Sequence, residues 1–89
     1  MARRLAFDPN AFAEFTSWAD NNLKYFLKIQ ELIKNIQRDP FGGIGKPEPL
    51  KHNKHGYWSR RIDATHRIVY KVTDDEIRII SCEHHYQKL

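Results

Sequence analysis

Residues 45–70 read GKPEPLKHNKHGYWSRRIDATHRIVY. The stretch begins in a loop over 41–49 that is rich in glycine and proline. From Tyr57 onward, apolar and polar residues alternate, as they do in β-strands. Segments 57–62, 67–73 and 76–82 predict three strands joined by turns that contain aspartate. The change from an irregular loop to a period of two therefore predicts a small sheet in the second half of the chain.

Two helices are predicted before this loop. A short apolar segment at 5–7 fits a strand, after which Asp8 can cap a helix and Pro9 can occupy its first position. Apolar side chains then recur at helical spacing over 12–19 and 26–36, and a pair of asparagines separates the two runs. We interpret both apolar stripes as core positions, and the two segments as a helical hairpin.

Length and composition limit the class of protein. The 89 residues predict one domain spanning 1–89. A net charge of +4 and a pI of about 9.4 favour nucleic acid or an acidic protein as partner. The single cysteine, Cys82, excludes an internal disulfide and fits a reducing compartment. No apolar signal region follows Arg3 and Arg4, and no run could span a membrane, so we expect a cytoplasmic protein without membrane contact.

The stretch 45–70 is strongly basic. With Lys71 just beyond its end, it carries seven Lys or Arg against two acids, Glu48 and Asp63. Histidines and aromatic residues lie among them, a composition that suits a polyanion with stackable bases. The candidate phosphate contacts in this stretch include Lys46, Lys54 and Arg60.

The strand pattern also brings two arginines together. A three-residue turn places Arg61 opposite Arg67, on the face that the helices do not cover. Like charges directly opposed destabilise a sheet, and a phosphate between them would remove the repulsion. In this register Arg60 falls on the apolar face, which leaves the register open.

Two other kinds of site are disfavoured. Gly43-x-Gly45-Lys46 lacks the spacing and the flanking strand of a phosphate-binding Walker loop. His84 and His85 are adjacent, and adjacent residues of a strand point to opposite faces. No Cys or acidic cluster at ligand spacing completes a metal site around them. We therefore expect neither a metal nor a cofactor.

Long runs of this sequence are similar to one known family. GIGKPEPLKHN, GYWSRRID, HRIVYKVTDD and the terminal HHY resemble the YoeB (Txe) toxins of bacterial type II toxin–antitoxin modules, within the RelE-like superfamily. The likeness covers nearly the whole chain. It implies an α+β fold in which two N-terminal helices pack on a small twisted antiparallel sheet. The chain departs from the family pattern at His84, where an aromatic residue is usual, and by three residues after Tyr86.

The resemblance also implies a function. Such toxins are endoribonucleases that cleave mRNA in the ribosomal A site and are neutralised by a YefM-type antitoxin. A homodimer is a further family expectation. Matching positions make Glu48, Arg67, His85 and Tyr86 the catalytic set, and Lys51 and Arg61 supporting phosphate contacts.

The residue types fit cleavage of RNA without metal. A base must take the 2′-hydroxyl proton, an acid must protonate the departing 5′-oxygen, and cations must hold the phosphorane between them. Glu48 is the candidate base, because Asp63 is a turn residue. His85 titrates near neutrality and is the candidate acid. Arg67 offers a planar fork for phosphoryl oxygens, and Tyr86 is expected to stack a base or orient the scissile phosphate.

Two non-enzymatic interpretations stay open at this point. The basic face could bind RNA or DNA without cutting it, or it could hold an acidic, disordered segment of an antitoxin. Both predict that Glu48→Gln leaves function intact. An enzyme predicts instead that this variant binds RNA tightly and no longer cleaves it.

Overall fold

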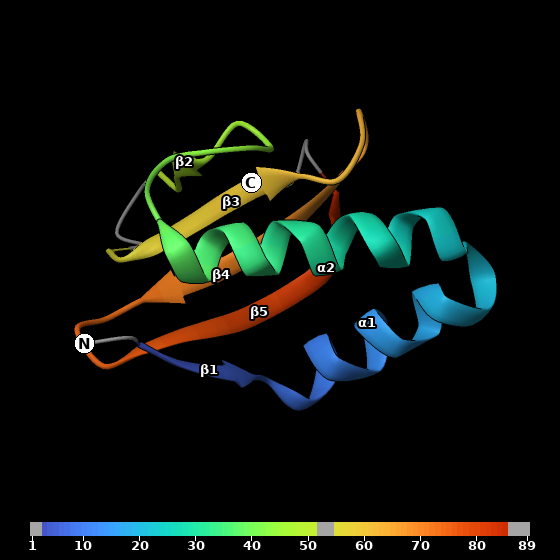
Figure 1. Ribbon diagram of the computed structural model, residues 1–89, viewed down its shortest axis with the longest axis horizontal. Coiled ribbons are helices and arrows are strands. Elements are labelled where there is room, and N and C mark those ends of the chain that lie inside the picture. The colour runs from blue at the N-terminus through green and yellow to red at the C-terminus, as the bar shows by residue number, and fades with distance from the viewer. Residues whose placement is uncertain (1–2, 52–54, 86–89) are drawn as a thin grey trace.

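The computed structural model describes residues 3–51 and 55–85, with His85 described by its backbone alone. The elements follow one another as β1 (Arg4–Phe7), α1 (Pro9–Asn21), α2 (Leu23–Arg38), β2 (Glu48–Pro49), β3 (Tyr57–Arg61), β4 (His66–Val72) and β5 (Glu76–His85). The strands form one five-stranded sheet in the order β1-β5-β4-β3-β2 (Figure 1). The predicted α+β fold with two N-terminal helices is confirmed.

The sheet is mixed rather than wholly antiparallel. β2 to β5 pair antiparallel, as their short connections require, whereas β1 lies parallel to β5 with Leu5 opposite Ile77. The apolar segment predicted at 5–7 therefore forms an edge strand. The loop predicted over 41–49 ends in a two-residue strand, β2, which pairs with β3.

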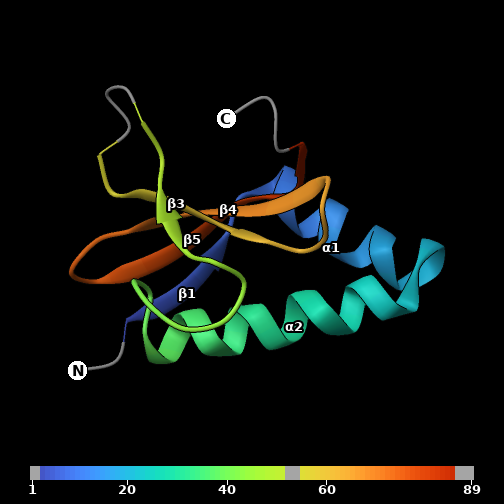
Figure 2. The same ribbon diagram turned by 90° about the horizontal axis from the view of Figure 1, so that it is seen from above.

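The core lies between the sheet and the two helices. Figure 2 shows α2 running along one face of the sheet. The apolar stripe of α2 packs there against alternate residues of β4 and β5, and the buried side chains are Ile29, Leu32, Ile33, Ile36, Ile68, Tyr70, Ile77 and Ile79. α1 packs on β5, where Trp18 Nε1 donates to the carbonyl of Cys82 at 2.9 Å. Phe12, predicted in the core, is instead 54% exposed and meets Phe7 edge-on.

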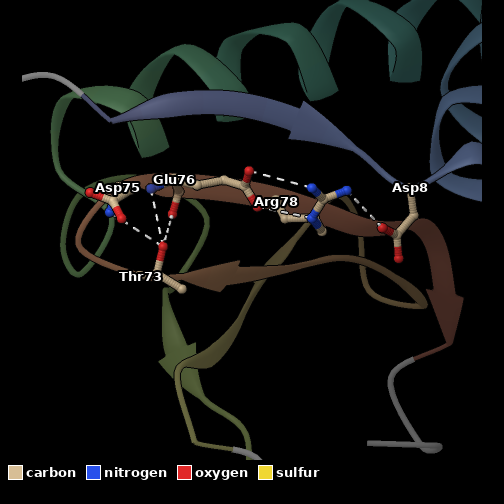
Figure 3. Close-up of polar contacts among 5 residues, drawn as sticks. All are labelled: Asp8, Thr73, Asp75, Glu76 and Arg78. Carbon is tan, nitrogen blue, oxygen red and sulfur yellow. Dashed lines mark hydrogen bonds and ion pairs between the residues drawn. The ribbon is translucent and has the colours of Figure 1, made fainter.

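The helix starts follow the predicted boundaries with one change of detail. Asn22 separates the helices and caps α2, because its Oδ1 accepts from the backbone of Tyr25 at 3.3 Å. Pro9 is the first residue of α1, but the Asp8 side chain does not cap that helix. Arg78 of β5 holds the Asp8 carboxylate at 3.2 Å and also bonds Glu76 (Figure 3). The prediction of a side-chain cap is therefore wrong, because Asp8 ties the start of α1 to β5.

β5 is longer and less regular than predicted. Tyr70 pairs with Ile79 and Val69 with Ser81, so β5 has one extra residue between these pairs. A bulge of this kind shifts which side chains face the core. It explains why Ile77, Ile79 and Ile80 do not alternate cleanly. A second bulge lies between the partners of Val69 and Arg67, and the strand then continues to His85.

Candidate functional site

The site lies on the face of the sheet turned away from α2, which we call the outer face. Three adjacent strands bring its residues together through their register. β2 places Glu48 opposite Ser59, and the hairpin of β3 and β4 places Arg61 opposite Arg67. Directly opposed residues of antiparallel strands project to the same side, so these four side chains share one surface.

An ion pair forms the centre of this group. Arg67 Nη1 lies 2.6 Å from Glu48 Oε1 and donates to Ser59 Oγ at 2.7 Å. The Arg67 side chain is 4% exposed, whereas that of Glu48 is 48% exposed. Charge-assisted bonds of this length fix a guanidinium firmly. The cation is thus held in place, while the carboxylate stays accessible.

The predicted pairing of Arg61 with Arg67 is confirmed. The repulsion between them is offset by the carboxylate of Glu48, which bonds Arg67 in this structure. Arg61 is partly exposed at the edge of the pair. Lys46 and Lys51 are exposed before and after β2, on the segment that carries Glu48. The segment around Glu48 therefore carries further positive charge, beside the one cation, Arg67, that an ion pair joins to the carboxylate within 3–51 and 55–85.

Arg60 is not part of this surface. The prediction that it contacts phosphate is wrong, because its side chain is completely buried on the opposite face of β3. Its guanidinium bonds carbonyl oxygens of the loop after α2 and the hydroxyl of Tyr70. Strand alternation had already indicated this orientation, since Arg60 shares its parity with Trp58 and Ile62.

The end of β5 carries the predicted histidines. His84 lies opposite Arg67, and the backbone of His85 lies opposite His66. The side chain of His85, and all of Tyr86 and Lys54, lie outside the described residues.

Two residues of the site were missed by the sequence reasoning. Ser59 bonds Arg67, and its small size among bulky strand residues was the available signal. His84 lies across from Arg67, and its Nε2 is buried with no hydrogen-bond partner within 3–51 and 55–85. Nothing in the sequence pattern could have shown the bulges that set the partner of His84.

The second acid of the basic stretch has a structural role. Asp63 Oδ1 accepts from the backbone of Thr65 at 2.8 Å and of His66 at 2.6 Å, and the His66 ring lies 3.2 Å away. Burial alone would raise the pKa of Asp63, but hydrogen bonds from Tyr25, His66 and Thr65 together hold it well below its usual range. The hydrogen bond between Tyr25 and Asp63 also raises the pKa of Tyr25. Asp63 is thus engaged in the turn, and Glu48 is the acid of this stretch that reaches the outer face.

Thiol and metal chemistry find no support in the described part of the chain. Burial, with the carboxylates of Glu14 and Glu83 nearby, raises the pKa of Cys82 to about 12, so the thiolate is scarce at neutral pH. Among residues 3–51 and 55–85, no three His, Cys, Asp or Glu side chains gather as a metal site would need. None of the helices there is long and apolar enough to cross a membrane.

The sequence matches a described family over residues 7–86, the YoeB-like toxins of bacterial type II toxin–antitoxin systems. Toxin YoeB of Streptomyces coelicolor is 49% identical over 83 residues, which are 93% of this chain and 99% of that protein. These shares leave little of either chain unmatched.

Solved structures agree with this match. The YoeB dimer from Staphylococcus aureus superimposes with a TM-score of 0.87 at 46% identity, covering 97% of this chain and 100% of that one. The heterotetrameric YoeB–YefM toxin–antitoxin complex from the same organism contains a chain with a TM-score of 0.83, 46% identity and the same coverage.

Proposed function

Because this chain belongs to the YoeB-like toxins of bacterial type II toxin–antitoxin systems, we propose that it is an endoribonuclease. It cleaves mRNA without a metal ion, in the A site of the ribosome, and so inhibits translation in the cytoplasm. The observation that carries the proposal is the pair of an exposed Glu48 carboxylate and an enclosed Arg67 guanidinium, 2.6 Å apart. A base and a phosphate-binding cation are needed side by side for this reaction.

In the proposed reaction Glu48 removes the proton of the ribose 2′-hydroxyl. The 2′-oxygen then forms a bond to phosphorus, and the bond from phosphorus to the 5′-oxygen breaks. The leaving 5′-oxygen takes a proton from an acid. The products are a 2′,3′-cyclic phosphate, which water can open to a 3′-phosphate, and a 5′-hydroxyl.

Arg67 stabilises the charge that develops on the phosphoryl oxygens. Its guanidinium is fixed by Glu48 and Ser59, so it needs little reorganisation when the phosphorane forms. Arg61 lies opposite it in the sheet, at the distance of a cross-strand neighbour, and adds a second positive charge. Lys46 and Lys51 contact neighbouring phosphates of the RNA.

The proposed acid is His85, and Tyr86 stacks on a base or orients the scissile phosphate. Both roles rest on the match of these positions to the family, and the backbone register adds only that the end of β5 lies near Arg67. His84 lies opposite Arg67, and β5 continues to His85 at the same end of the sheet. The end of β5 therefore lies beside the ion pair.

The proposed partner that restrains the toxin is a YefM-like antitoxin. A relative from S. aureus is known in a YoeB–YefM complex. An acidic segment of such an antitoxin would cover the basic residues around Glu48, and its association with this chain should slow as salt rises. The same organism's YoeB forms a dimer, so we expect this chain to form a homodimer as well.

The proposal is tested by single-turnover cleavage of a ribosome-bound mRNA, and independence of metal by cleavage of the same RNA free in solution in excess chelator. We expect wild-type protein to cleave and leave a 5′-hydroxyl, and an mRNA with a 2′-deoxy residue at the scissile position to resist. Glu48→Gln should bind RNA at least as tightly as wild type but cleave at least ~10²-fold more slowly. Glu31→Gln, which changes an exposed glutamate of α2, is the matched control.

Two results would overturn the proposal. Loss of cleavage in chelator with rescue by one divalent ion would show metal-dependent chemistry. Wild-type cleavage by Glu48→Gln would show that Glu48 is not the base. If no cleavage is found while RNA or antitoxin still binds, the basic face is a binding surface and the chain is a non-catalytic module.

A further inference from the structure

We propose that Arg60 is a positioning residue for Glu48: from inside the core, it holds the loop that leads to Glu48 and so sets the place of the carboxylate beside Arg67. The inference rests on the proposed function, because it assumes that Glu48 is the base. Arg60 itself is completely buried and does not reach the outer face.

The guanidinium of Arg60 binds three backbone carbonyls in the first half of the loop. Nη2 donates to the carbonyl of Asp39 at 2.6 Å and to that of Gly42 at 2.8 Å. Nη1 donates to the carbonyl of Ile44 at 3.1 Å and to Oδ1 of Asn35 on α2. One planar group thus fixes three points of the loop and the end of α2 together.

Tyr70 of β4 adds two further hydrogen bonds to this group. We refer to Arg60, Tyr70 and the loop carbonyls that they bind as the clasp. The Tyr70 hydroxyl accepts from Arg60 Nε at 3.1 Å and donates to the carbonyl of Pro40 at 2.7 Å. Both side chains are completely buried. A core that only needed filling would hold an apolar side chain at lower cost, because burying a charge is unfavourable unless its donors are bonded. The bonded loop carbonyls therefore explain why arginine stands at this position.

The second half of the loop is tied to the neighbours of Arg60. The backbone of Arg61 donates to the carbonyl of Gly45 at 2.7 Å. Gly45 has a φ of +81°, and a Cβ there would lie 2.7 Å from Leu32 Cδ2 and 3.2 Å from Arg60 Cβ. The loop therefore passes directly over the stem of Arg60, three residues before Glu48.

β3 joins the clasp to the site by strand alternation. Arg60 faces the core and the loop, whereas Ser59 and Arg61 face the outer surface. Ser59 lies opposite Glu48 and bonds Arg67. A shift of the loop relative to β3 would therefore move Glu48 relative to Arg67. Displacements of about 1 Å at a reacting group can lower a rate by ~10²-fold.

The test compares Arg60→Lys with wild type and with Arg4→Lys, a matched change at an exposed arginine of β1. Lysine keeps the charge but cannot bind several carbonyls with one planar group. We expect the single-turnover rate at saturating RNA to fall by roughly 10²-fold, with the RNA Kd changed by less than about 3-fold. Amide hydrogen exchange should quicken at Ile44, which donates to Asn35 Oδ1, and at Arg61, which donates to the Gly45 carbonyl, while circular dichroism stays that of a folded protein.

Tyr70→Phe gives a second, milder variant in case Arg60→Lys fails to fold. It removes one hydroxyl from the clasp and keeps the ring in the core. The rate at saturating RNA should fall by about 10-fold, again without a change in Kd. In Arg60→Ala, added methylguanidinium should restore part of the rate, because it can occupy the space of the lost guanidinium.

The outcomes separate this inference from the proposed function. If Glu48→Gln is inactive but Arg60→Lys and Tyr70→Phe cleave like wild type, the positioning role is overturned and the proposed function stands. If Glu48→Gln cleaves like wild type, the proposed function fails instead. A weaker Kd and a flatter salt dependence for Arg60→Lys, at an unchanged saturating rate, would make Arg60 an RNA contact and would overturn the inference as well.

Discussion

Arg67 is enclosed and Glu48 is open, although the two side chains form one ion pair of 2.6 Å. The guanidinium is 4% exposed and is also bound by Ser59, whereas the carboxylate is 48% exposed. A pair built only for stability would gain little from a partner so open to water. The asymmetry suits a site in which the cation is fixed in advance and the base meets the substrate.

Replacing Arg67 tests its contribution to cleavage and its contribution to stability. Arg67→Ala should reduce the cleavage rate at least ~10²-fold, because a donor to the developing oxyanion is lost. The variant should also lose stability, because the Arg67 side chain is buried. We expect the free energy of unfolding to fall by ~1–3 kcal/mol, since the partners of a buried polar group are left unbonded. Urea denaturation and single-turnover assays measure the two effects.

The control for this variant is Arg4→Ala, which removes an exposed arginine from β1. Changes at exposed positions usually stay within about 0.5 kcal/mol. Equal stability losses in the two variants would show that the enclosure of Arg67 contributes nothing to the fold.

Arg61 should act through charge rather than through the fold. Arg61→Ala is expected to weaken RNA binding and to reduce the slope of log K against log salt by about one unit, because one phosphate contact is lost. Binding titrations over a series of salt concentrations measure that slope. Lys34→Ala, at an exposed position of α2, should leave it unchanged. An unaltered slope for Arg61→Ala would remove this residue from the RNA interface.

Adjacent histidines provide an internal control for the proposed acid. His85→Ala should lose at least ~10²-fold in rate and should be partly rescued by added imidazole, because imidazole can supply the missing proton. His84→Ala tests the neighbour that lies opposite Arg67, and we expect no rescue there. Rescue of His84→Ala but not of His85→Ala would exchange the two roles.

Much of the fold could be read from the sequence because it depends on local periodicity. The apolar stripe of α2 and the alternation of β3 and β4 each follow from the spacing of side chains. The parallel pairing of β1 could not be predicted in this way, since it joins residues 70 or more apart and leaves no local pattern. The same holds for Asp8, whose carboxylate binds Arg78 instead of capping its own helix.

The candidate site, like the fold, could be predicted from the sequence only in part. The three-residue turn was enough to place Arg61 opposite Arg67. The partner of Arg67 is set by β2, a strand of two residues that is too short to have a period. Arg60 was misassigned because composition counts charge without regard to the face on which it lies. Arg60 shares its strand parity with Trp58, which indicates that it faces the core. A buried arginine needs hydrogen-bond partners, and here the folded loop supplies them.

The last prediction concerns the turn at Asp63, where pH should reveal its contribution to stability. Hydrogen bonds from Tyr25, His66 and Thr65 outweigh burial and lower the pKa of Asp63 in the folded state. A carboxyl group of this kind stabilises the fold above its unfolded pKa of about 3.9, and the stabilisation is lost as pH falls toward the lowered folded pKa. Asp63→Asn should therefore reduce the free energy of unfolding at pH 7 by ~1–3 kcal/mol.

The gap between wild type and Asp63→Asn should stay open down to about pH 4, because Asp63 is ionised in both the folded and the unfolded chain above that pH. Below that pH the gap should close, since wild-type Asp63 becomes protonated in the unfolded chain and then in the folded one. Urea denaturation of both proteins between pH 7 and pH 2.5 measures this course. A gap that is constant over the whole range would show that the turn does not depend on the charge of Asp63.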